Sequence, residues 1–176
     1  MFINSSPQSV ENSAYLSEAQ AFIHFNRCAM PVKFQIIPEI PLTYGRYSGT
    51  VTLLEIIKQM KDTYLRPDYI EGACELADLT DTDNLVLSKQ EFSVLLEEVA
   101  WHHSGVGPHR KMCVVRPPNK WPATEELFLQ LKDKIGEILP IHIVDTPADA
   151  VSLLEIPTER LHLLPPKFAN HLVTSH

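Results

Sequence analysis

The side chains best suited to chemistry are three closely spaced aspartates, Asp78, Asp81 and Asp83. They follow the apolar stretch 73–79, a predicted strand, and ligands of open α/β sheets bind at the carboxyl ends of strands. Carboxylate oxygens at such a place could hold a divalent cation. The ordinary alternative is a solvated turn whose carboxylates favour the start of the next helix. The aspartates are therefore candidates for binding a ligand or partner, and no metal is assigned to them.

Two patterns that would give these aspartates a defined chemistry do not fit. A calcium loop counted from Asp81 needs glycine and glutamate at the positions of Val86 and Phe92. A phosphoacceptor receiver domain would end its fifth strand in lysine, but that predicted strand ends in Asp145-Thr146-Pro147.

A second group consists of His102, His103 and His109, with Cys113 beyond them. Zinc accepts such ligands only where they converge tetrahedrally. Adjacent histidines on a helix usually point apart, and a cysteine in an apolar strand is typical of a core. The sequence therefore predicts no metal site and no cofactor. An enzyme that uses the aspartates or histidines with a metal is kept as an alternative.

The two tryptophans, Trp101 and Trp121, are candidate anchors for a ligand or partner. Trp101 ends one predicted helix and Trp121 precedes the next, so both are expected at the rim between these helices. A large aromatic ring with a polar N–H suits an interface, and packing at the edge of the core is the alternative. Because nucleophile, Cys-x-x-Cys and phosphate-loop motifs are absent from the sequence, no enzymatic activity is predicted.

Composition narrows the class of protein. The net charge of −7 and the pI near 5.6 argue against nucleic acid as a partner. Three cysteines without a short spacing (Cys28, Cys74 and Cys113) fit a reducing compartment. No apolar run is long enough to span a bilayer and no secretory signal is recognisable, so a cytoplasmic location is expected.

The elements that must position these residues alternate between strand and helix patterns, which predicts one small α/β domain with a mostly parallel sheet. Residues 80–87 are expected to be a polar loop, and Ser88-Lys89-Gln90-Glu91 reads as a capping box. The tight connection Pro38–Pro41 makes the first strand antiparallel. Strands are expected at 33–37, 43–48, 73–79, 111–116 and 141–144, with helices beginning at Thr52, Ser88, Thr124 and Asp145-Thr146-Pro147.

The chain divides into an N-terminal extension (1–31), the α/β domain (32–156) and a C-terminal arm (157–176). Prolines forbid one long helix in the arm. The arm is nevertheless too apolar for a solvated tail, so it is expected to pack as a broken helix or extended segment on the domain or on a second subunit. Its apolar residues are Leu161, Leu163, Leu164, Phe168 and Leu172.

The segments Tyr44–Gly49 and Glu75–Leu79, the capped helix at Ser88 and the closing stretch Ile141–Ala150 resemble the SpoIIAA-like proteins. These are small bacterial relatives of STAS domains, the fold of anti-sigma-factor antagonists. The resemblance covers residues 33–154 and implies a SpoIIAA-like sandwich. STAS regulators carry a phosphorylatable serine at the start of the helix after the third strand. Only Ser88 matches it by position, because this chain has no Ser-Ser-Gly turn.

The expected function is a non-catalytic binding or regulatory module that acts by protein–protein contact and forms a homo-oligomer. The first alternative is a carrier or sensor of a small amphipathic, lipid-like ligand, because the SpoIIAA-like fold is similar to that of CRAL-TRIO lipid-transfer domains. An apolar pocket would favour the carrier, and an exposed apolar patch would favour the interaction module.

Overall fold

The computed structural model describes residues 30–104, 111–116, 128–130, 132–134, 136–137 and 139–173. These residues form an α/β domain around a five-stranded sheet in which the strands lie in chain order. The first pair is antiparallel and the remaining pairs are parallel, which confirms the predicted fold class. The strands are β1 (Val32–Ile37), β2 (Leu42–Thr52), β3 (Cys74–Val86), β4 (Met112–Val115) and β5 (Ile141–Val144).

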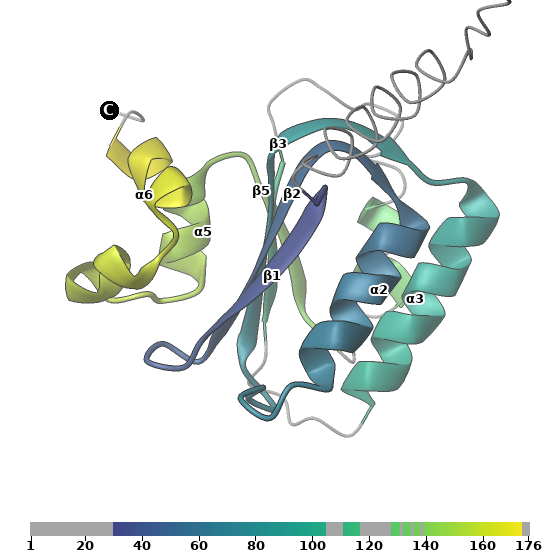
Figure 1. The fold of residues 1–176 in the computed structure, drawn as a ribbon, viewed down its shortest axis with the longest axis horizontal. Coiled ribbons are helices and arrows are strands. Elements are labelled where there is room, and N and C mark those ends of the chain that lie inside the picture. Colours follow the sequence, from purple (N-terminus) through teal and green to yellow (C-terminus); the bar gives the residue numbers. More distant parts are fainter. Residues whose placement is uncertain are drawn as a thin grey trace, which may run out of the picture. The chain divides into compact units, whose positions relative to one another are not determined.

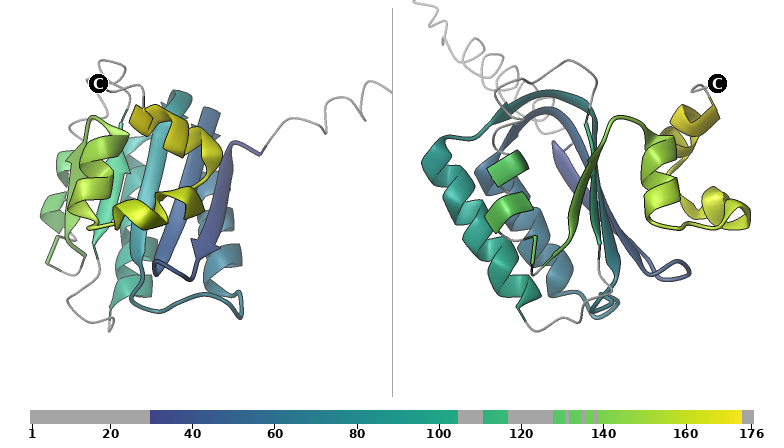
Figure 2. Two further views of the ribbon diagram at one scale, coloured as in Figure 1. Left: turned by 90° about the vertical axis from the view of Figure 1, so that its left-hand side faces the viewer. Right: turned by 180° about the vertical axis from the view of Figure 1, so that it is seen from behind.

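Helices cover both faces of the sheet (Figure 1). On one face lie α2 (Leu53–Tyr64) and α3 (Lys89–His103). On the opposite face lie α5 (Pro147–Leu153), the 3-10 helix η1 (Thr158–Leu163) and α6 (Pro166–Val173), as both views of Figure 2 show. Because side chains alternate along a strand, the sheet contributes to two separate hydrophobic cores, one under each layer of helices.

Two of the predicted helix starts, at Ser88 and Thr146, are confirmed by their capping hydrogen bonds. At α3, the Ser88 hydroxyl accepts from the Glu91 N–H at 3.2 Å, and the Glu91 carboxylate accepts from the Ser88 N–H at 2.8 Å. At α5, the Thr146 hydroxyl accepts from the Asp149 N–H at 3.1 Å. These bonds satisfy backbone N–H groups that a helix leaves without an internal partner in its first turn.

The prediction of a polar loop at 80–87 is wrong, because β3 continues to Val86 and β2 continues to Thr52. The two extensions pair with each other across two register shifts, and Gly49 takes a positive φ of 65° at the second one. By contrast, the pairing between β3 and β4 covers only Glu75–Asp78 of β3 among the described residues. The far part of β3 can therefore carry polar side chains that face solvent, which is why it lacked the apolar signature of a buried strand.

The C-terminal arm packs on the sheet as a broken helix, as predicted. Leu164 and Phe168 are buried, and the ring of Phe168 meets that of Tyr44 edge-on with centroids 5.6 Å apart. The three other arm leucines pack against the same core.

Two expectations reach beyond the described residues. The helix predicted from Thr124 is described only in part, as helical residues at 128–130 and 132–134. The N-terminal extension lies outside the described residues apart from Met30 and Pro31. In the part of the chain that is described, every helix is too short or too polar to cross a membrane.

Candidate functional site

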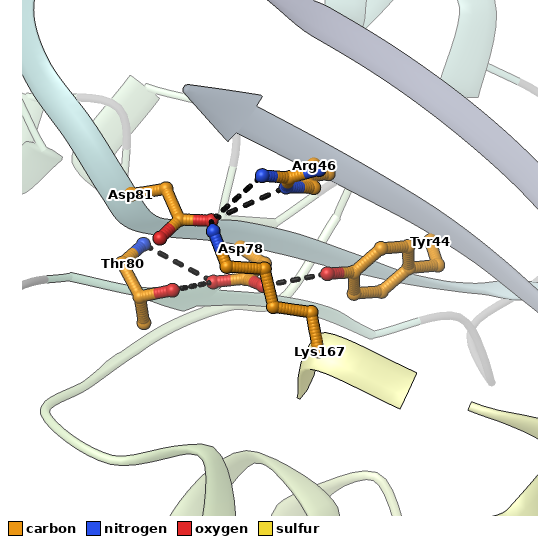
Figure 3. Close-up of polar contacts among 6 residues, drawn as sticks. All are labelled: Tyr44, Arg46, Asp78, Thr80, Asp81 and Lys167. Atoms are coloured by element: carbon orange, nitrogen blue, oxygen red, sulfur yellow. Dashed lines mark hydrogen bonds and ion pairs between the residues drawn. The ribbon is translucent and has the colours of Figure 1, made fainter. Parts of the chain in front are cut away.

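Two of the three candidate aspartates meet on the sheet face that carries α6 (Figure 3). Asp78 is only 3% exposed, and its carboxylate accepts from the Tyr44 hydroxyl at 2.5 Å. Its other oxygen accepts from the Thr80 N–H and hydroxyl at 3.1 and 2.7 Å. Burial, together with the neighbouring Asp78, raises the pKa of Tyr44 far above its usual value. The phenol therefore remains a donor, and the buried carboxylate is held by protein groups.

Asp81 connects the sheet to the C-terminal arm. Its Oδ2 atom accepts from Arg46 Nε and Nη2 at 3.2 and 3.0 Å, and also from Nζ of Lys167 on α6. Burial alone would raise the pKa of Asp81, but the hydrogen bonds from Lys167 and Arg46 outweigh it and lower that pKa. We call Arg46, Asp81 and Lys167 the arm latch.

The aspartate group therefore has a structural explanation. The C-terminal arm covers Asp78 and Asp81. Lys167 of the arm bonds to Asp81, and the next residue, Phe168, packs on Tyr44. Asp83 is exposed and is not part of the contacts that Figure 3 shows. This arrangement could not be predicted from the sequence, because Lys167 lies 86 positions from Asp81.

The predicted histidine group is not brought together among the described residues. His103 is 1% exposed, with Nε2 3.9 Å from the Glu75 carboxylate. His102 instead packs on Tyr64 and Trp101, with ring centroids 4.4 and 4.8 Å apart.

The other members of that group offer no additional ligand. His109 lies outside the described residues. Cys113 is a core residue whose thiol pKa is raised by burial to about 12. Across the described ranges, no three His, Cys, Asp or Glu side chains converge to hold a metal ion. That the protein binds no structural zinc stays a prediction.

Ser88 lies on the surface at the start of α3. Its hydroxyl both accepts from the Glu91 N–H and donates to the Glu91 carboxylate, the latter at 2.7 Å. Ser88 therefore caps α3, as the capping-box pattern predicts.

Trp101 lies in a groove between α2 and α3 and is 72% exposed. The groove has a volume of about 630 Å³, and Leu65 and Val94, 85% and 41% exposed, share it with the indole. An ion pair between Lys61 and Glu98, 3.0 Å long, joins the two helices. The complete lining is Lys61, Leu65, Val94, Glu97, Glu98, Trp101 and His102, and we call this surface the outer groove.

The sequence pattern explains why the indole faces outward. The buried side of α3 is formed by Phe92, Leu96, Val99 and His103. Trp101 follows Val99 by two positions, so at about 100° per residue it lies on the opposite side of the helix. Trp101 was therefore identifiable from sequence as an anchor, but Leu65 was not, because it follows the last turn of α2. The prediction that both tryptophans lie at the rim between α3 and the helix from Thr124 is untested, because Trp121 lies outside the described residues; the groove that Trp101 lines is the one between α2 and α3.

A scan against protein-family models finds no match for this chain, and a search of curated proteins finds no significant similarity. The fold and the geometry of these surfaces are therefore the evidence that bears on function.

Proposed function

We propose that this protein is a non-catalytic binding module whose protein partner docks in the outer groove. The observation that carries the proposal is the exposure of Trp101 beside Leu65. Single exposed apolar side chains are common on soluble proteins, but a group of them in a concave surface is typical of an interaction site. Tryptophan is also among the residues that contribute most to binding when an interface buries them.

The partner segment that fits best is an amphipathic helix with basic residues beside its apolar side. A groove between two helices accepts the apolar stripe of a third. Two glutamates, Glu97 and Glu98, line the groove against one lysine, Lys61, which pairs with Glu98, and the whole chain carries a net charge of −7. Lysine or arginine on the partner would therefore be attracted to this surface. A second copy of the chain would bring the same acidic residues and the same net charge, so self-association through this groove is less favourable.

Other expectations are proposals of lesser support. The order of strands and helices, and the capped helix at Ser88, support a relationship to the SpoIIAA-like regulators, and with it a cytoplasmic regulatory role in bacteria. An enzyme built on Asp78 and Asp81 is less well supported, because the arm and Tyr44 already engage these carboxylates. A homo-oligomer stays a prediction that light scattering can test.

A pair of synthetic helical peptides tests the proposed docking. One peptide carries a leucine stripe flanked by lysines, and the other has glutamate in place of every lysine. The lysine peptide should bind the full chain, and the glutamate peptide should bind far more weakly. Trp101→Ala should weaken binding of the lysine peptide roughly thirtyfold, the effect of a hot-spot residue worth about 2 kcal/mol.

The matched control is Leu54→Ala, because Leu54 is 76% exposed on the same pair of helices but does not line the groove. It should leave the affinity unchanged. The proposal is contradicted if the lysine peptide does not bind, or if Trp101→Ala and Leu54→Ala have equal effects in fluorescence anisotropy.

A further inference from the structure

A cavity of about 80 Å³ lies between the sheet and the inner sides of α2 and α3. Its floor contains Gly45 and Ala77, which are direct partners in the β2–β3 register. The ring of Phe34, which also lines the cavity, lies over Gly45, where a Cβ atom would come within 2.7 Å of it. The walls include Ile56 and Met60 from α2, and Phe92 from α3. The cavity therefore has an almost entirely apolar body, on the other side of the helices from the outer groove.

One end of the cavity is polar. Thr43 and Glu75 both line it, and they are direct partners in the same register, so their side chains point to the same face of the sheet. The Glu75 carboxylate accepts from the Tyr64 hydroxyl at 2.9 Å. Thr43 is only 2% exposed, yet its hydroxyl has no hydrogen-bond partner among the described residues. A buried hydroxyl without a partner is unfavourable and rare in folded proteins, so it points to a group that enters the cavity.

We propose that this cavity is a binding site for a small, neutral, amphipathic molecule. Its hydroxyl or similar polar group would hydrogen-bond to Thr43 at the polar end, and its apolar body would lie against Met60 and Met112. The volume is about half that of an engineered cavity of about 150 Å³ that takes benzene, so a short alkyl chain fits better than a long acyl chain. A ligand with its own carboxylate would meet the Glu75 carboxyl group in a buried site, which disfavours an anion.

The site does not depend on the proposed function, because docking in the outer groove uses the opposite sides of α2 and α3. Methionine methyl signals in isotope-labelled full-length protein provide the readout. Met60 and Met112 line the cavity, and Met30, which is 58% exposed, is an internal control. The probes are n-propanol and n-propyl chloride, which share an apolar body smaller than benzene but differ in the hydroxyl.

Thr43→Val is the decisive variant, because it keeps the shape and β-branching of the residue and removes a hydroxyl that has no protein partner. Thr82→Val is the matched control: Thr82 is fully buried, its hydroxyl likewise lacks a partner among the described residues, and it does not line the cavity. We expect n-propanol to shift the Met60 and Met112 signals saturably and to leave the Met30 signal unchanged. Thr43→Val should weaken the binding of n-propanol about fivefold, the effect of one lost neutral hydrogen bond, and Thr82→Val should not weaken it.

The chloride should bind the wild type and Thr43→Val equally, because it makes no use of the hydroxyl. Saturable shifts that respond to Thr43→Val alone would support the site. The proposal is overturned if n-propanol gives no saturable shift at Met60 and Met112, if Met30 shifts equally, or if the two threonine variants bind n-propanol alike.

Discussion

The two faces of the sheet are covered by helices to different extents. The face under α5, η1 and α6 is closed by the chain itself, with Phe168 fully buried on Tyr44 and the arm latch at its edge. The face under α2 and α3 retains a cavity beneath the helices and an exposed tryptophan above them. Asp78 and Asp81, two of the three aspartates that the sequence marked as candidates for chemistry, are on the closed face, where they bond to Tyr44 and to the arm. The face with room for a ligand or partner is the one whose helices looked like ordinary amphipathic helices.

The largest expected loss of stability comes from a substitution on the closed face. Phe168→Ala should lower the free energy of unfolding by about 3–5 kcal/mol, the usual cost of removing a buried phenylalanine side chain. Urea denaturation measures it, with Leu54→Ala as the control at an exposed apolar site. If a chain that lacks the arm (157–176) melts at the same temperature and has the same mass in solution as the full chain, the arm does not close this face.

The next largest loss of stability is expected from a substitution at the start of α3. Ser88→Ala should cost about 0.5–2 kcal/mol, because it removes a helix cap, while Ser88→Asp should be tolerated because aspartate also caps helices. Thermal unfolding of the two variants measures the difference. If Ser88→Asp folds normally but abolishes binding of the lysine peptide, Ser88 acts as a phosphorylation switch and not only as a cap.

On the open face, one substitution should increase stability. Thr43→Val replaces a buried hydroxyl that has no partner among the described residues. It should therefore raise the free energy of unfolding by about 1 kcal/mol. Urea denaturation in the absence of any probe measures this gain. A loss of stability would show that the hydroxyl already has a favourable partner, and the polar end of the cavity would need another explanation.

The smallest effect concerns the arm latch. Asp81→Asn should cost about 0.5 kcal/mol at neutral pH, because Arg46 and Lys167 are 40% and 52% exposed and solvent screens both pairs. The pKa of Asp81 is lowered in the folded state, so its contribution is present above the unfolded pKa of about 3.9 and is lost as the pH falls through the lower folded value.

The difference in stability between wild type and Asp81→Asn should therefore shrink below about pH 4. Urea denaturation at several pH values measures it. A difference that stays constant down to pH values below the folded pKa would contradict the latch.

Local signals in the sequence predicted most of the fold. Capping boxes, apolar runs and the tight first connection identify the strands and the helix starts, because each depends on residues a few positions apart. The extension of β3 to Val86 was missed, since its stability comes from pairing with β2 and not from burial on both faces. For the sites, the sequence predicted Trp101 as a candidate anchor, and the helical period explains why the structure places its ring on the outer side of α3. The latch was not predictable, because Asp81 and Lys167 meet only through the tertiary packing of the arm.

Hydrogen exchange of the full chain, with and without the lysine peptide, tests the difference between the two faces most directly. We expect the peptide to slow exchange in α2 and α3 and to leave exchange in η1 and α6 unchanged, and we expect Trp101→Ala to remove the effect. Slower exchange in η1 and α6, or equal protection in wild type and Trp101→Ala, would show that the partner does not dock in the outer groove.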